Sequence, residues 1–189
     1  ESLVAPIDDG AHFRMLETIR DYARDRLQAT GDQAAVRARH RDYFVALAEE
    51  DEPHLEGGPE QPVWLAQLEL EHDNLRAALA KSLEDPDDAD LRLCGAFYRF
   101  WAHRGHSHEG REWCAAALAR AAGRPGTTSH LQALHASGTL AWRLRDITAA
   151  RSQLQEALNL SRDLGDRPRE GRILNNLGGV AMHQADDQA

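Results

Sequence analysis

The sequence predicts an all-α protein, an array of antiparallel helical hairpins preceded by a short β-hairpin. Three observations predict this fold class. Ala, Leu and Arg are the most frequent of the 189 residues and aromatic residues make up only 6% of them, a composition that favours helix over strand. Apolar residues recur every three or four positions over most of the chain, which is the period of a helix with one buried face. A pattern of small and large residues also repeats about forty residues apart, which indicates stacked units.

Residues 1–16 are expected to form the β-hairpin. Residues 2–7 suit an extended segment, and the alternation over residues 12–16 suits a second one. Between them, Asp8-Asp9-Gly10 is a turn signal because Asp tolerates turn conformations and Gly adopts positive φ freely. A lone hairpin is marginal in water, so we expect it to pack on another part of the protein.

Residues 17–86 are expected to form linking helices that pack on the array. We expect one helix over residues 15–30, ended by Gly31, a second from Asp32 to about residue 55, and a third over residues 62–83. Pro- and Gly-rich sequence separates the second from the third. The side chains expected on their buried faces are Leu16, Ile19, Tyr22, Ala23 and Leu27, then Val36, His40, Tyr43, Phe44, Leu47 and Ala48, then Trp64, Leu65, Leu68, Leu75, Leu79 and Leu83.

Residues 87–189 are expected to hold three hairpins. Their bounds are 87–124, 129–165 and 168–189, and the last is incomplete because it contains only its first helix. We therefore expect the natural protein to continue past Ala189 with further repeats. The expected helices cover residues 88–104 with 107–122, residues 129–144 with 147–164, and residues 168–185.

Small residues at matching places in these hairpins indicate close contact between helices. Gly138 and Ala150 would let two helices approach, and a glycine inside a helix costs about 1 kcal/mol relative to alanine, so packing is the economical explanation. Such hairpins must stack to bury their apolar faces. The pattern resembles the tetratricopeptide repeat. Positions that recur forty residues apart are Leu134 with Leu174, Gly138 with Gly178, Ala141 with Ala181, and Asp146 with Asp186.

Four stretches, in order, carry a wider resemblance: HFRMLETIRDYARDRL, HRDYFVALAEE, WLAQLELEHDNLRAAL and FWAHRGHSHEGREW. They resemble the C-terminal region of bacterial STAND-type regulatory ATPases, particularly actinobacterial transcriptional regulators of the LuxR and AfsR kind. In that family a nucleotide-binding domain is followed by a winged-helix domain and then by helical repeats. The resemblance implies that residues 1–16 are the wing of the winged helix and that the chain is a fragment of such a regulator.

Several function classes receive no support from the sequence. It contains no GxxxxGK[ST] phosphate loop and no GxSxG elbow, so we expect this fragment to be no enzyme and to use no cofactor, whereas the resemblance implies ATPase activity for the full-length protein. The net charge of −9 argues against direct nucleic-acid binding. No apolar run is long enough for a membrane span, and Cys94 and Cys114 imply no disulfide framework, so a cytoplasmic protein is expected.

The run AHRGHSHEGREWC, residues 102–114, raises the question of a metal site. Metal ligands on a helix favour spacings of three or four residues. His103 and His106 have such a spacing, but Gly105 lies between them at an expected helix end, and His106 and His108 would diverge on a helix. We therefore interpret the run as the turn of a hairpin with no metal. A metal-responsive sensor that uses His103 to His108 is the weakest alternative.

Repeat arrays of this kind bind ligands on the concave surface that the first helix of each pair forms. Arg and Asn donors along such a surface suit a peptide backbone, a carboxylate or an acidic loop. The alternative, that these side chains are merely exposed and polar, remains open. The candidate binding residues are Arg99, His103, His135, Thr139, Trp142, Arg143, Asn175 and Asn176.

The favoured hypothesis is therefore a regulatory sensor and protein-interaction module of a multidomain ATP-dependent transcriptional regulator. The expected partner is a protein or peptide, or a small-molecule effector, together with the nucleotide-binding domain of the full-length chain. Direct contact with nucleic acid or a membrane is not expected. The alternative is a constitutive tetratricopeptide-like scaffold that binds a protein partner without any switch.

Overall fold

The computed structural model describes the backbone of residues 4–7 and 12–186 and the side chains of residues 15–183. The chain divides into two compact units, residues 1–40 and residues 41–189. The division falls inside a helix, α2 (Gln33–Asp51). It differs from the predicted domain boundaries at residues 16 and 86, which stay predictions.

The first unit contains two short strands and a helix. β1 (Val4–Ile7) pairs antiparallel with β2 (His12–Met15), with Val4 opposite Met15. The expected turn at Asp8-Asp9-Gly10 lies outside the described residues. α1 (Glu17–Thr30) ends at Gly31, whose left-handed backbone lets its N–H reach the carbonyl of Gln28. α1 buries none of its side chains, so the buried stripe expected over residues 16–27 is absent from it.

Two expectations about the linking helices are wrong. The second helix ends at Asp51 and is followed by a 3-10 turn, η1 (Glu52–Leu55), because Pro53 has no N–H for a longer helix. The third is two helices, α3 (Gln61–Leu70) and α4 (His72–Glu84), separated at Glu71. α3 packs on η1 and α5, whereas α4 packs on α5 and α6, and one straight helix would not cover both sets of neighbours.

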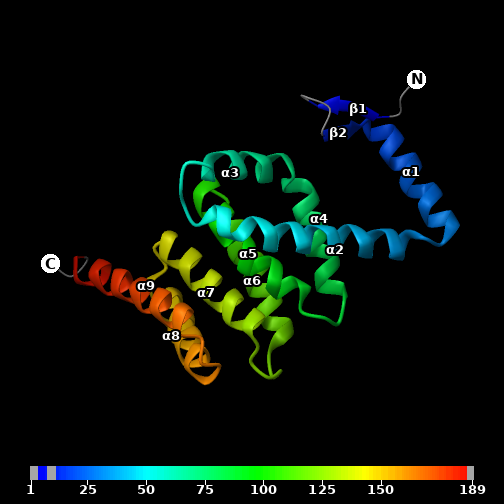
Figure 1. Cartoon of the computed structure of the whole chain (residues 1–189). Helices are drawn as coiled ribbons and strands as arrows, with labels where there is room; N and C mark the ends of the chain where they lie inside the picture. The colour runs from blue at the N-terminus through cyan, green and yellow to red at the C-terminus, as the bar shows by residue number, and fades with distance from the viewer. Residues whose placement is uncertain (1–3, 8–11, 187–189) are drawn as a thin grey trace. The chain divides into compact units, whose positions relative to one another are not determined.

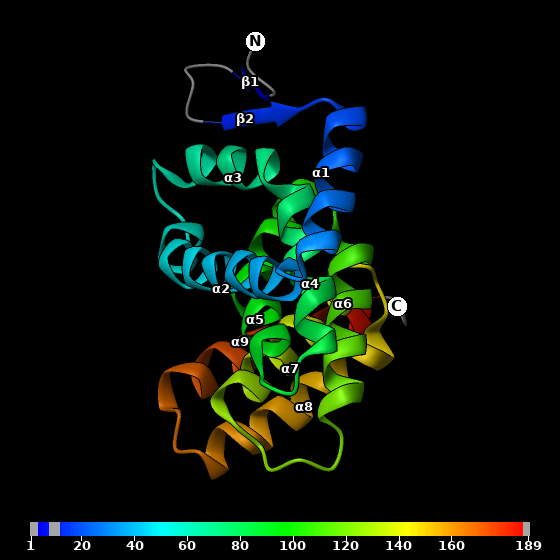
Figure 2. The same cartoon turned by 90° about the vertical axis from the view of Figure 1, so that its right-hand side faces the viewer.

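The remaining helices follow in consecutive pairs, and each lies within one residue of its expected bounds. They are α5 (Ala89–Arg104), α6 (Ser107–Ala121), α7 (Thr128–Arg143), α8 (Ile147–Asp163) and α9 (Arg167–Asp186). Local signals set several ends: Thr127 and Asp146 accept hydrogen bonds from the first turns of α7 and α8, and Gly105 ends α5 in a left-handed conformation. Figures 1 and 2 show these helices packed side by side, and the packed core is all-α.

Glycines allow close helix contacts in this array, as the sequence predicts. A Cβ atom at Gly138 would lie 2.8 Å from Cγ of Leu154 on α8, and one at Gly110 would collide with the ring of Trp101 on α5. Gly178, which matches Gly138 in the sequence, has no such neighbour. The close contact of α9 is made instead by the adjacent Gly179.

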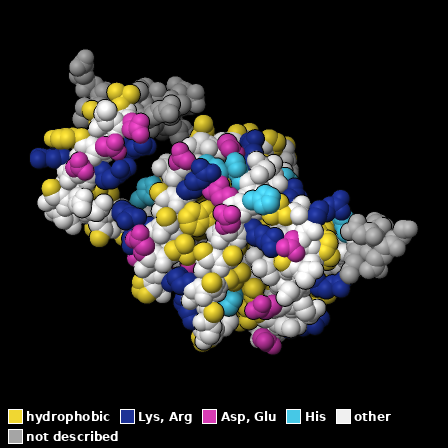
Figure 3. Space-filling model, turned by 180° about the vertical axis from the view of Figure 1, so that it is seen from behind, with side chains coloured by type: hydrophobic (Ala, Val, Ile, Leu, Met, Phe, Trp, Pro, Cys, Tyr) yellow, Lys and Arg dark blue, Asp and Glu magenta, His cyan; other side chains and the backbone are white. Residues whose placement is uncertain are grey.

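The second unit has two apolar cores, and α7 contributes to both. The first core draws on α2 to α7 and includes Phe97, Phe100 and Trp101, while the second draws on α7, α8 and α9 around Leu154. Figure 3 shows basic and acidic side chains interspersed on one face of the molecule, as is usual for a solvated surface. Among the described residues, no helix has the length and apolar character needed to cross a membrane.

Candidate functional site

A hollow of about 500 Å³ lies between α5, α7 and α9. These three are the first helices of successive pairs, and they neighbour one another in the order α5, α7, α9 (Figure 1). We call it the α5–α7–α9 hollow. Its lining residues are Tyr98 and Arg99 from α5, His135 and Thr139 from α7, and Pro168, Gly171, Arg172, Asn175 and Asn176 from α9.

The α5–α7–α9 hollow brings together five of the eight candidate residues: Arg99, His135, Thr139, Asn175 and Asn176. They come from three helices that are about forty residues apart in the chain. The repeat period therefore places equivalent faces next to one another, as expected for stacked hairpins. Polar side chains that converge in a concave surface are typical of ligand sites.

A hydrogen-bonded chain of side chains fixes the floor of the hollow. Nδ2 of Asn176 lies 3.0 Å from Nε2 of His135 and donates to Oγ1 of Thr139 at 2.9 Å, and that hydroxyl donates to the carbonyl of His135 at 2.8 Å. Because an amide nitrogen only donates, Nε2 of His135 accepts and its proton sits on Nδ1. Burial, followed by the charges of Arg99, Arg169 and Arg172, lowers the pKa of His135 to about 4. The imidazole is therefore neutral at pH 7.

Two arginines at the hollow share one carboxylate. Nη2 of Arg99 donates to Oε1 of Glu56 at 3.2 Å, and Nη1 of Arg172 lies 2.5 Å from the same oxygen. Nη1 of Arg99 is buried without a hydrogen-bond partner and lies 3.8 Å from Glu52, while the guanidinium sits 4.7 Å from the ring centroid of Tyr98. The site thus offers guanidinium donors for which an incoming carboxylate would compete with Glu52 and Glu56.

The structure places the other three candidates outside the hollow. Nε1 of Trp142 donates to Nδ1 of His183 at 3.4 Å, so the indole is directed to α9 and the second core. Arg143 donates to the carbonyl of Ala102 at 2.8 Å. His103 is exposed, and burial and then the charges of Arg143 and Arg99 lower its pKa. All three are on α5 and α7 but contribute nothing to the lining of the hollow.

Four residues that line the hollow and two carboxylates that bind its arginines were not predicted from the sequence. Arg172 precedes Asn176 by four residues and thus shares its helix face, so helical spacing was a signal for it. Glu52 and Glu56 had no such signal, because Glu52 begins η1, Glu56 directly follows it, and both reach the arginines through tertiary contacts alone.

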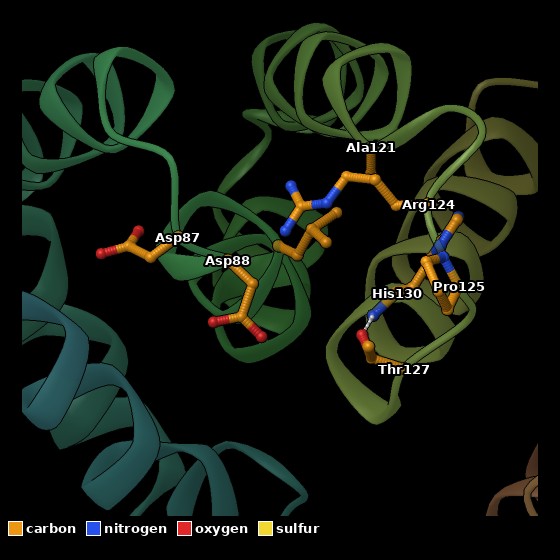
Figure 4. Close-up of a pocket in the computed structure, with 8 residues that line it drawn as sticks. Asp87, Asp88, Ala121, Arg124, Pro125, Thr127 and His130 are labelled. Carbon is orange, nitrogen blue, oxygen red and sulfur yellow. Dashed lines mark hydrogen bonds between the residues drawn. The ribbon is translucent and has the colours of Figure 1, made fainter.

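A second hollow, of about 350 Å³, contains none of the candidate residues. Figure 4 shows Asp87 and Asp88 on one side of it and Pro125, Thr127 and His130 on the other. Its carboxylates already have partners, since Asp88 accepts from Oγ of Ser129 at 2.7 Å and Asp87 lies 3.0 Å from Arg41. The α5–α7–α9 hollow, which side chains from three helices line, is the better candidate for ligand binding.

Three curated mycobacterial proteins match the chain, each 40% identical over 102 residues. They are named "Putative HTH-type transcriptional regulator" Rv0890c and MT0914, from two strains of Mycobacterium tuberculosis, and Mb0914c, from Mycobacterium bovis. Part of the chain is homologous to part of these proteins. The match covers 53% of this chain but only 11% of each relative. No protein-family model matches the chain, and no solved structure matches it with significance.

Proposed function

We propose that the chain is a regulatory sensor and protein-interaction module of a large cytoplasmic HTH-type transcriptional regulator of the STAND class, related to the LuxR and AfsR kind. The observation that carries the proposal is the α5–α7–α9 hollow, where Arg99, Arg172, Asn175 and Asn176 converge from helices at equivalent places of successive hairpins. Part of the chain is homologous to proteins named as putative HTH-type transcriptional regulators, which supports the same assignment.

The ligand class follows from the donors of the hollow. Guanidinium and amide groups surround a neutral, buried imidazole, and such donors suit a carboxylate of an acidic peptide or of a small effector. The tetratricopeptide-like stacking of the hairpins gives an extended peptide a surface along α5, α7 and α9.

The switch that we propose acts through Glu56. A carboxylate that binds Arg99 and Arg172 would displace Glu56 from both guanidinium groups and so release η1, the turn that directly follows α2. In the full-length protein this change would alter how the module restrains the nucleotide-binding domain. It is a population shift, and it requires a ligand whose affinity differs between the two states.

Thermal denaturation in the presence of a panel of dicarboxylic acids and acidic hexapeptides tests the binding step. Ligand at a hundred times its Kd should stabilise the wild-type chain by about 2.7 kcal/mol. Asn175→Asp places a negative charge in the hollow at an exposed position and should abolish the shift. Arg143→Gln on α7, outside the hollow, is the matched control and should retain it. An equal shift in Asn175→Asp, or no shift with any compound, contradicts the proposed site.

The alternative is a constitutive scaffold that binds a protein partner in the same hollow. ATP hydrolysis by the full-length regulator separates the two, because a sensor predicts that a peptide which stabilises the chain also changes the hydrolysis rate. A rate that the bound peptide leaves unchanged would favour the scaffold.

A further inference from the structure

His72 is a buried histidine whose Nε2 atom has no hydrogen-bond partner. It is the first residue of α4, its side chain is 10% exposed, and its ring packs edge-on against Phe100 with 5.2 Å between centroids. Nε2 lies 3.3 Å from Oε2 of Glu109 without the alignment of a hydrogen bond. A buried polar atom without a partner is costly, so this nitrogen calls for an explanation.

Two further ligand-type side chains meet His72 at this point. Glu69 is in the last turn of α3, and His106 is the N-cap residue of α6. Nε2 of His106 lies 3.0 Å from Oε1 of Glu69, and the rings of His72 and His106 are 4.2 Å apart between centroids. One ligand atom from each of the three residues lies within 4.8 Å of the other two.

We propose that Glu69, His72 and His106 form a binding site for a divalent transition-metal ion of the Zn²⁺ type. Two imidazoles and one carboxylate are a donor set that zinc accepts, with bonds of about 2.0–2.2 Å. Such bonds place ligand atoms about 3.5 Å apart in a tetrahedron, so small side-chain movements within the observed cluster suffice. Imidazole nitrogens also favour Zn²⁺ over Mg²⁺ or Ca²⁺, which prefer oxygen ligands.

The protonation state of His72 suits a metal ligand. Burial lowers the pKa of His72, with opposing effects from Glu109 and Glu69, which raise it, and from Arg76 and His106, which lower it. A neutral imidazole presents the lone pair that a metal needs. Arg76 donates two hydrogen bonds of 2.7 Å to Glu109, so we do not count Glu109 as a metal ligand. The three remaining ligands leave the fourth position of a tetrahedral ion open.

An ordinary ion pair explains only part of this arrangement. A pair between Glu69 and protonated His106 would satisfy those two side chains but would leave Nε2 of His72 with only its misaligned contact to Glu109. A metal ion satisfies all three. It would also link α3 and α4, on either side of the break at Glu71, to the turn between α5 and α6. We therefore expect the ion to stabilise this end of the array, independently of the α5–α7–α9 hollow.

Titration of the EDTA-treated chain with Zn²⁺ by calorimetry, and with Co²⁺ by visible absorption, tests the site. We expect one ion per chain, the absorption bands of low-coordinate Co²⁺, and a rise in Tm with Zn²⁺ but not with Mg²⁺. His106→Ala and Glu69→Gln should each weaken binding at least about 10-fold, since even residues that only support metal ligands change affinity by this factor or more. The exposed side chain of Glu69 makes Glu69→Gln the variant that tests the site without disturbing the core.

His108→Ala is the matched control, because His108 is an exposed histidine only two residues from His106 and outside the cluster. It should bind Zn²⁺ as the wild type does, and circular dichroism at 222 nm should show that all variants keep their helices. The proposal is overturned if the wild type binds no stoichiometric Zn²⁺. It is equally overturned if Glu69→Gln and His106→Ala bind with wild-type affinity, or if His108→Ala loses binding to the same extent.

Discussion

Asp51 is a buried carboxylate, only 1% exposed, and neither of its oxygens has a hydrogen-bond partner. It is the last residue of α2, where the helix dipole also disfavours negative charge. Burial, followed by the charge of Glu50 and opposed by that of His54, raises its pKa from 3.8 to about 6. The ionised form therefore destabilises the fold.

The sign of this effect predicts its pH dependence. Well below pH 3.8 Asp51 is protonated in both the folded and the unfolded chain, so its ionisation has no effect on stability. As the pH rises through the folded pKa of about 6, stability is lost, by about 3 kcal/mol at pH 7 for a pKa difference of this size. We predict that Asp51→Asn raises the free energy of unfolding by about 2–3 kcal/mol at pH 7.5 and by little at pH 3.5, measured by urea denaturation.

Asp163→Asn is the control for this prediction. Asp163 is likewise the last residue of its helix, α8, but it is exposed. Like Asp51 it lies at the negative end of a helix dipole, but it is not buried. Its replacement should therefore change the free energy of unfolding by less than about 1 kcal/mol at either pH. Equal effects of the two replacements would show that burial does not cause the destabilisation.

At the scale of the helices, two neighbouring glycines of α9 have opposite surroundings. A Cβ at Gly179 would lie 2.5 Å from the ring of Trp142, whose indole is also held by a hydrogen bond to His183. A Cβ at Gly178 would meet nothing within 4 Å. The contact between α7 and α9 thus depends on one glycine, and the helix propensity of the two positions is the same.

We predict that Gly179→Ala lowers the free energy of unfolding by about 1–2 kcal/mol, because overpacking outweighs the gain in helix propensity. Gly178→Ala should raise it by about 0.5–1 kcal/mol, the usual gain when alanine replaces glycine inside a helix. Thermal denaturation of the two variants beside the wild type measures the difference. Two stabilised variants would show that the ring of Trp142 moves away at little cost.

At the scale of the whole helical unit, α7 is shared by two apolar cores. α9 packs on α7 and α8, and among the described elements α8 packs closely on α7 and α9. In arrays where each element contacts only its neighbours, one part of the structure can unfold locally while another stays folded. The second core should therefore open without complete unfolding of the first.

Leu154→Ala tests this separation, since Leu154 is fully buried in the second core. The cavity should cost about 2–5 kcal/mol, and hydrogen exchange should accelerate in α8 and α9 more than in α4 and α5. Leu93→Ala, an equally buried leucine of the first core, should accelerate exchange throughout the array. Uniform acceleration by Leu154→Ala would instead mean that the two cores unfold as one.

The helical units from residue 89 onward, and their ends to within one residue, could be predicted from the sequence, because helical period and caps are local. Gly105, Thr127 and Asp146 act within one turn of the chain. The same local periodicity predicted that Arg99, His135, Thr139, Asn175 and Asn176 share one surface, since equivalent faces of stacked hairpins become neighbours.

Other features depend on contacts between helices that are distant in the chain. The break at Glu71 is invisible in the apolar spacing, which continues from Leu68 to Leu75, because it arises from the different neighbours of α3 and α4. Trp142 was predicted to lie on the binding surface, but its indole donates a hydrogen bond to His183 on α9. Glu56 contacts Arg99, which lies 43 residues away in the chain, and His106 contacts Glu69, which lies 37 residues away. Contacts at such distances depend on how whole helices pack, and no local pattern of residue types encodes them.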